Sequence, residues 1–197
     1  MYDAVADPYC YPGTTVLRNI PDLKTQDALD AFEAVSTTQR ADEPLPEGRL
    51  SVRHYQAIHR HLFQDVFAWA GRFRTVRMSK DASAFCYPEH IAREMKSLFE
   101  SLKAKRYFHG LSTEDFATSA ADFLSTLNAI HPFREGNGRT QTILLALLAD
   151  RAGHPLDLER LEAQPFLAAI VTSFRGDMHD LVSQIEYLAR PAGSQSI

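Results

Sequence analysis

HPFREGNGRT (residues 131–140) is a polar, glycine-containing stretch between two strongly apolar segments of the chain. Before it, apolar residues recur at helical spacing from Phe116 to Leu127, and after it residues 143–149 are apolar on almost every side. These patterns predict two helices buried in the core, the second of them at its centre. The stretch between them is therefore expected to be a turn that the core fixes at both ends.

The composition of this turn suits the binding of phosphate. Gly136 and Gly138 let the main chain bend and let a ligand come close to the amides, and Asn137 adds a side-chain amide. The turn leads into a helix, whose first N–H groups and partial positive charge attract an anion. Arg139 offers a planar guanidinium to phosphate oxygens, and we group Arg134 of the same turn with these predicted nucleotide-binding residues.

Two further side chains of the turn carry reactive groups. Glu135 provides hard oxygen ligands that suit the Mg²⁺ ion accompanying nucleotide phosphates. His131 can take up a proton near neutral pH and stands four residues before this predicted metal ligand. We therefore predict that His131 removes the proton of a hydroxyl group beside a metal-bound phosphate.

The same residues match, at every specified position, the pattern His-x-Phe-x-Asp/Glu-Gly-Asn-Gly-Arg, which is the signature of the Fic (filamentation induced by cAMP) family. The chain resembles this family from Phe67 to about Gly153. The resemblance implies an all-α fold, in which a compact helical bundle surrounds a central buried helix and carries a small β-hairpin called the flap. We expect one such domain to cover residues 1–197.

The resemblance also implies an activity. Members of the family transfer AMP from ATP to a Tyr, Thr or Ser hydroxyl of a target protein. In this chain His131 would be the base, Glu135 would hold Mg²⁺, and Asn137 and Arg139 would bind the phosphates. The same cradle could carry a different phosphate-containing group, or could bind a nucleotide or peptide without turnover. The presence of Gly136 and Gly138 favours nucleotidyl transfer.

A second motif follows Ala70-Gly71, where the pattern changes from helical to extended. The β-prone run from Phe73 to Met78, a turn at residues 80–83 and a return at residues 84–87 predict a short hairpin. In Fic proteins this position holds the flap, whose strand edge would pair with an extended segment of the target and hold its hydroxyl over the base. The residues we assign to this target-binding flap are Thr75, Val76, Arg77, Met78, Ser79, Lys80 and Phe85.

The remaining segments read mainly as helices. Residues 1–21 are rich in turn signals and predict an irregular arm, and residues 191–197 predict a frayed tail. The predicted helices begin near Thr25, with Leu29, Phe32 and Val35 inward; at Ser51, with Tyr55, Ile58, Leu62 and Val66 inward; at Pro88, ending near Tyr107; at Ser112; and near Gln164 and Met178. Three histidines, His54, His59 and His61, lack the i, i+4 spacing of a helical metal site.

Composition bounds the partners and the compartment. The net charge of −4 and the pI near 6.0 speak against binding of nucleic acid, and no apolar run reaches the length of about 18 residues that a membrane span needs. The N-terminus shows no secretory signal, and Cys10 and Cys86 fit no metal motif. We expect a bacterial cytoplasmic protein with free thiols; delivery by a specialised secretion machine is compatible with this N-terminus.

Two differences between this sequence and the usual Fic patterns bear on regulation. Self-inhibited Fic proteins carry Ser/Thr-x-x-x-Glu-Gly/Asn, whereas Glu47-Gly48 and Glu135-Gly136 here follow Glu43 and His131 at the first position. The resemblance therefore points to the toxin of a toxin–antitoxin module, whose small antitoxin supplies an inhibitory glutamate in trans. The family's usual second Arg, which holds the terminal phosphate, is replaced by Thr142, and Arg175 is the alternative candidate for that role.

Overall fold

The structure is a computed structural model that describes residues 7–80 and 83–189. Within these residues the chain forms seven α-helices, two 3₁₀ helices and one pair of two-residue strands. In chain order they are α1 (Gln26–Ala41), α2 (Val52–Phe63), β1 (Ser79–Lys80), β2 (Ser83–Ala84), α3 (Pro88–Ala104), η1 (Arg106–Phe108), α4 (Thr113–Ile130), α5 (Asn137–Ala152), η2 (Leu158–Arg160), α6 (Ala163–Ser173) and α7 (His179–Leu188). The predicted all-α class is confirmed.

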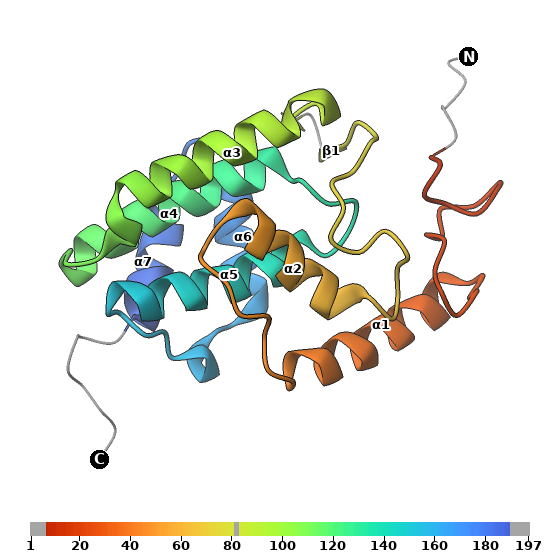
Figure 1. The fold of residues 1–197 in the computed structure, drawn as a ribbon, viewed down its shortest axis with the longest axis horizontal. Coiled ribbons are helices and arrows are strands. Elements are labelled where there is room, and N and C mark those ends of the chain that lie inside the picture. Colours follow the sequence, from red (N-terminus) through yellow and green to blue (C-terminus); the bar gives the residue numbers. More distant parts are fainter. Residues whose placement is uncertain (1–6, 81–82, 190–197) are drawn as a thin grey trace.

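Helices α4 and α5 form the centre of the bundle. Helix α4 packs against α3, α5, α6 and α7, and α5 also packs against α2, so that α5 passes through the middle of the molecule (Figure 1). Leu124 and Leu127 of α4 and Leu144 and Leu148 of α5 are fully buried. The predicted central helix is therefore confirmed, and the turn that joins the two helices is fixed at both ends by the core.

Local signals set most helix ends where the sequence predicts them. The hydroxyl of Ser51 accepts the N–H of His54 at the start of α2, and that of Ser112 accepts the N–H of Asp115 at the start of α4. Pro88 is the first residue of α3, where its missing N–H costs little. Gly153 ends α5 in the left-handed conformation.

Three helix predictions need correction. Val66 was placed in the helix that begins at Ser51, but it lies beyond the end of α2 at Phe63, although it is buried. Val35 was predicted to point inward from α1, but it is 59% exposed. Helix α1 packs mainly against α2, and its buried stripe runs through Leu29, Ser36 and Thr37, which share a face at i, i+7 and i+8. The helix from Pro88 ends at Ala104 rather than Tyr107, because the next residues form η1 with positive φ angles.

The predicted hairpin exists, but its strands are shorter than expected. Ser79 pairs with Ala84 and Lys80 with Ser83 in antiparallel register, and the turn predicted at residues 80–83 includes residues 81–82, which lie outside the described residues. Residues 73–78 form no ladder with residues 85–87, apart from the N–H of Phe85, which donates to Met78 at 3.1 Å. Instead, the N–H of Arg74 donates to Pro132 of the turn, and the N–H of Cys86 donates to Ala129 near the end of α4.

The N-terminal arm is irregular, as predicted, over its described residues. An isolated bridge joins Cys10 to Leu17, and the ring of Tyr9 meets that of Trp69 edge-on at 5.5 Å between centroids. Both cysteines have free thiols. None of the helices in residues 7–80 and 83–189 is long and apolar enough to span a membrane. The predicted frayed tail at residues 191–197 lies outside the described residues.

Candidate active site

His131 directly follows α4, and its main chain turns there into the left-handed region with φ 47°. Its N–H donates to Leu127 at 3.0 Å, so the residue ends the helix and redirects the chain. A residue other than glycine is uncommon in this conformation and needs support from its surroundings. Part of that support is the ring of Phe85, which stacks on the imidazole with 4.0 Å between centroids and 15° between planes.

The side chain of Asn137 holds the turn in shape. Its oxygen accepts the N–H of Phe133 at 3.0 Å, and its nitrogen donates to the carbonyl of Phe133 at 2.8 Å. The side chain is 3% exposed. The sequence analysis offered this amide to a phosphate, whereas in the structure both of its polar groups serve the turn itself.

His59 is a functional neighbour that the sequence analysis did not find. Its Nδ1 accepts the N–H of Gly71 at 2.9 Å, so its Nε2 carries the proton and donates to the carbonyl of Glu135 at 2.9 Å. Burial lowers the pKa of His59 to about 4, which keeps the ring neutral. His59 therefore links α2 to the turn. Within the described part of the chain, no three His, Cys, Asp or Glu residues lie together as a metal cluster.

The two glycines of the turn have different reasons to be glycine. Gly136 has φ 80°, and a Cβ atom on it would lie 2.3 Å from the ring of Phe63. A Cβ atom on Gly138 would meet no atom within 4 Å. The fold itself therefore requires glycine at residue 136, whereas residue 138 faces open space that a ligand can use.

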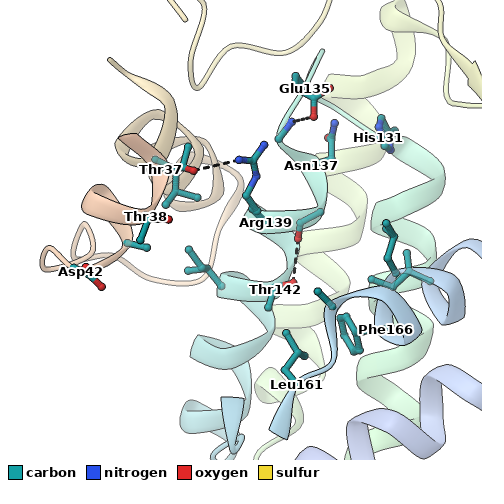
Figure 2. A pocket seen from close by; sticks show the side chains of 18 residues that line it. Thr37, Thr38, Asp42, His131, Glu135, Asn137, Arg139, Thr142, Leu161 and Phe166 are labelled. Atoms are coloured by element: carbon teal, nitrogen blue, oxygen red, sulfur yellow. Dashed lines mark hydrogen bonds between the residues drawn. The ribbon is translucent and has the colours of Figure 1, made fainter. Parts of the chain in front are cut away.

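A cavity of about 630 Å³ lies beside the turn, a size typical of small-ligand sites. Figure 2 shows its lining from three directions: the turn and α5, helix α1, and the segment that leads into α6. The polar lining consists of Thr37, Thr38, Asp42, His131, Glu135, Gly136, Asn137, Gly138, Arg139 and Thr142. The apolar lining consists of Ala41, Leu62, Ile143, Leu161, Ala163, Phe166, Leu167 and Ile170. The cavity thus offers a polar end at the turn and an apolar end at α6 and the segment before it, while α1 contributes mainly polar side chains.

The polar end has the properties of an anion site. Helix α5 begins at Asn137, and its first intrahelical bond runs from the N–H of Thr140 to Gly136 at 3.2 Å. The N–H groups of residues 137–139 therefore have no acceptor within the helix, and the helix dipole adds positive potential there. Of the residues predicted to bind nucleotide, Gly136, Gly138 and Arg139 meet here.

Arg139 is held from helix α1, a contact that the sequence analysis did not predict. Its guanidinium donates to the hydroxyl of Thr37 at 3.2 Å (Figure 2). It also forms an ion pair with Glu33 and lies over the ring of Phe63 at 4.7 Å. The side chain of Glu33 is only 14% exposed. Burial raises the pKa of the Glu33 carboxyl, against the opposing effect of the Arg139 charge.

Three other residues discussed for the phosphates are two candidate ligands, Arg134 and Arg175, and Thr142, which replaces the family's second Arg. Arg134 does not line the cavity; its guanidinium pairs with Asp7 of the N-terminal arm, with Nε 2.9 Å from the carboxylate. Thr142 lines the cavity and donates its hydroxyl to the carbonyl of Gly138 at 3.1 Å. Arg175 is absent from the described lining of this cavity. The structure thus gives Arg134 an internal partner and places Thr142, as expected, beside the ligand space.

The position of Glu135 fits a magnesium ligand. The side chain is exposed, lines the cavity and accepts the N–H of Gly136 at 2.9 Å. Mg²⁺ in nucleotide sites is commonly held by one or two carboxylates together with the substrate phosphates, and seldom by an all-protein cage. A single carboxylate beside an anion site matches that mode of binding.

The flap lies against His131. Exposure alternates along residues 75–79, since Thr75, Arg77 and Ser79 are exposed while Val76 and Met78 are partly covered. Such alternation is typical of an extended segment with one free face. Phe85, which the sequence analysis assigned to target binding, is 8% exposed and packs on His131. Its position makes it a support for the His131 ring and not part of the exposed face of residues 75–79.

Comparison with known proteins places the chain in a family. The sequence model of the Fic/DOC family matches residues 49–149, just over half of the 197 residues. The chain belongs to the Fic/DOC family. A Sinorhizobium fredii protein of this kind, "Probable protein adenylyltransferase y4lH", is 50% identical over 185 residues, which cover 93% of this chain and 96% of that protein.

Solved Fic structures share the fold. The BepC protein of Bartonella tribocorum, solved with bound AMPPNP, superimposes with a TM-score of 0.83 at 27% identity and covers 93% of this chain and 96% of that one. The N-terminal Fic domain of a Bartonella quintana effector, solved with bound ADP, gives a TM-score of 0.84 at 28% identity, with coverages of 94% and 96%. The predicted Fic fold is confirmed.

Proposed function

We propose that this Fic protein is a protein adenylyltransferase, which transfers AMP from ATP to a hydroxyl group of another protein. The observation that carries the proposal is the single cavity into which His131, Glu135, Arg139 and the N-terminus of α5 all face. The name of the Sinorhizobium fredii relative and the nucleotides in two Bartonella structures support it. A base, a metal ligand and a phosphate cradle in one cavity are what nucleotidyl transfer to a hydroxyl requires.

The cavity orients ATP by its two ends. The triphosphate would lie at the N–H groups of residues 137–139, and the Gly138 position leaves room for a phosphate to approach them. The adenine ring would lie at the apolar end, against residues such as Phe166 and Ile170. Arg139 would exchange Glu33 for phosphate oxygens, because a guanidinium binds either anion through the same fork of N–H groups.

The reaction follows from this arrangement. His131 accepts the proton of the target hydroxyl, and the hydroxyl oxygen forms a bond to the α-phosphorus of ATP. The bond from the α-phosphorus to the oxygen bridging it to the β-phosphate breaks, and pyrophosphate leaves with its electron pair. Residues 137–139 and Arg139 stabilise the negative charge that develops on the phosphates. Mg²⁺ held by Glu135 would neutralise part of the same charge when bound.

The proposal includes two protein partners. The target would lie as an extended segment along the exposed face of residues 75–79, close to the base. A small antitoxin would supply a glutamate to the phosphate site in trans, as the lack of the self-inhibitory motif suggests. Arg139 already binds the carboxylate of Glu33, which supports the idea that this site accepts a carboxylate in place of phosphate.

One experiment tests the activity and its alternatives. The purified chain is incubated with Mg²⁺, a bacterial lysate and ATP labelled in the α-phosphate, or with ATP labelled in the γ-phosphate as a parallel sample. Adenylyl transfer labels protein only from α-labelled ATP, and His131→Ala abolishes the signal. Label from γ-labelled ATP would establish phosphate transfer instead, and ATP binding without any label would establish a binding module.

A further inference from the structure

Arg74 is buried at 2% exposure, and it is the one Lys, Arg, Asp or Glu to be so among the residues whose burial the structure describes. Its guanidinium forms no ion pair with a carboxylate in that part of the chain and donates only to main-chain carbonyls. Taking a cation out of water is costly unless its N–H groups are satisfied. Burial lowers the pKa of this guanidinium, which reflects that cost. A buried cation of this kind must fix something that an apolar residue could not.

The acceptors of Arg74 belong to two different segments. Where α4 meets the turn, Nε donates to the carbonyl of His131 at 2.7 Å, and Nη2 lies 3.3 Å from the carbonyl of Ile130, the last residue of α4. On the flap, Nη1 donates to Val76 and Nη2 to Cys86, both at 2.6 Å. One planar group thus binds the carbonyl of the base residue itself and both arms of the flap.

Neighbouring main-chain hydrogen bonds also connect the flap to the turn and to the end of α4. The N–H of Arg74 donates to Pro132 at 2.9 Å, and the N–H of Cys86 donates to Ala129 at 3.0 Å. Together with the stacking of Phe85 on His131, these bonds make the flap and the turn one unit. The left-handed conformation of His131 is held from its carbonyl by the buried guanidinium.

We propose that Arg74 is a positioning residue for adenylyl transfer, which fixes the distance between the target segment on the flap and the His131 base. The inference rests on the proposed function, because it assigns Arg74 a role in that same reaction. The guanidinium is suited to this role by its rigid fork, which can reach four carbonyls at once. The ammonium of a lysine has the same charge but a single donor atom, and it cannot span both segments.

Arg74→Lys tests the proposal in the full-length protein, with Arg72→Lys as a matched control, since Arg72 is exposed in the same segment. For AMP transfer from α-labelled ATP, we expect kcat to fall about tenfold to a hundredfold in Arg74→Lys, because small displacements of reacting groups have effects of that size. ATP affinity, measured by calorimetry, should stay within about twofold of wild type, as Arg74 contacts no residue of the phosphate cradle. A parallel loss of ATP affinity and kcat, or kcat within about threefold of wild type, would overturn the proposal.

Hydrogen exchange on the wild-type protein tests the coupling without relying on activity or on a variant. The amides of Arg74, Phe85 and Cys86 should open together, with the same dependence on low denaturant concentration. Separate opening of the flap amides and the Arg74 amide would overturn the inference. A wild-type chain that transfers no AMP but shows joint opening would contradict the proposed reaction while leaving the coupling established.

Discussion

The two ends of the turn formed by residues 131–140 are held in contrasting ways. At the His131 end, the imidazole stacks on the ring of Phe85, and the main-chain carbonyl accepts a hydrogen bond from the buried guanidinium of Arg74. At the Arg139 end, the guanidinium is 42% exposed and pairs with the carboxylate of Glu33. A base must be in place before the substrate arrives, whereas a phosphate ligand must be able to give up its partner. The comparison indicates a fixed chemical end and an exchangeable binding end.

His131→Ala should have the largest effect and should separate the two ends. Loss of a positioned base typically reduces the rate by about 10²–10⁴. ATP affinity should remain close to wild type, because the proposed phosphate site lies at the other end of the turn, at the start of α5. Single-turnover transfer from α-labelled ATP measures the rate, and calorimetry measures the ATP affinity. Transfer within threefold of wild type would remove His131 from the role of base.

The glycines provide a matched pair. Gly136→Ala should destabilise the fold by about 3 kcal/mol, because the new methyl group meets Phe63 and φ is 80°. Gly138→Ala should leave stability unchanged or raise it by up to about 1 kcal/mol, since alanine favours the helix. The same change should weaken ATP binding about tenfold or more, by filling the space at the amides. Urea unfolding and calorimetry of both variants check this; unchanged ATP affinity in Gly138→Ala would place the phosphate elsewhere.

The buried hydrogen bond from His59 to Glu135 of the turn should make the free energy of unfolding depend on pH. The pKa of His59 is about 4 in the folded protein and about 6.5 when unfolded, so the unfolded chain takes up the proton first as the pH falls. Its contribution is present above pH 6.5 and is lost between pH 6.5 and 4. We expect about 2 kcal/mol less stability from this residue at pH 5 than at pH 7. Urea unfolding at several pH values should show that the free energy of unfolding falls by about 2 kcal/mol more in wild type than in His59→Gln between pH 7 and pH 5. An equal fall in both proteins would contradict a buried neutral ring.

The smallest effect is predicted at the exchangeable end. In Glu33→Gln, ATP no longer competes with a carboxylate for Arg139, so its affinity should rise, by about tenfold or less for a partly exposed pair. Asp30→Asn is the control, because it removes a nearby negative charge of α1 that pairs with Gln26 and not with Arg139. Calorimetry with Mg-ATP measures both variants. Weaker binding in Glu33→Gln would mean that Glu33 orients Arg139 for the phosphate instead of competing with it.

The sequence predicted those parts of the fold that local signals determine. Ser51, Ser112, Pro88 and Gly153 act on their own helix ends, so their effects could be read from neighbouring residues. The strongly apolar run after the turn identified the central helix α5 for the same reason. The placement of Val35 failed because α1 has little apolar contrast between its faces, and its packing against α2 decided which face is buried.

The missed site residues depend on contacts that are distant in sequence. Arg74 and His131 are separated by 57 positions, His59 and Glu135 by 76, and Glu33 and Arg139 by 106. Arg74 is buried, while its apolar neighbour Phe73 is only partly so. An arginine inside an otherwise β-prone run was the available signal, and only the folded structure identifies its acceptors.

A structure of the protein with Mg²⁺ and a non-hydrolysable ATP analogue would test the contrast between the two ends most directly. We predict that the guanidinium of Arg139 leaves Glu33 and binds the phosphates at the start of α5. In this complex, the hydrogen bonds from Arg74 to His131, Val76 and Cys86 should be the same as in the ligand-free structure. A bound analogue with Arg139 still paired to Glu33, or with the Arg74 bonds broken, would contradict the account.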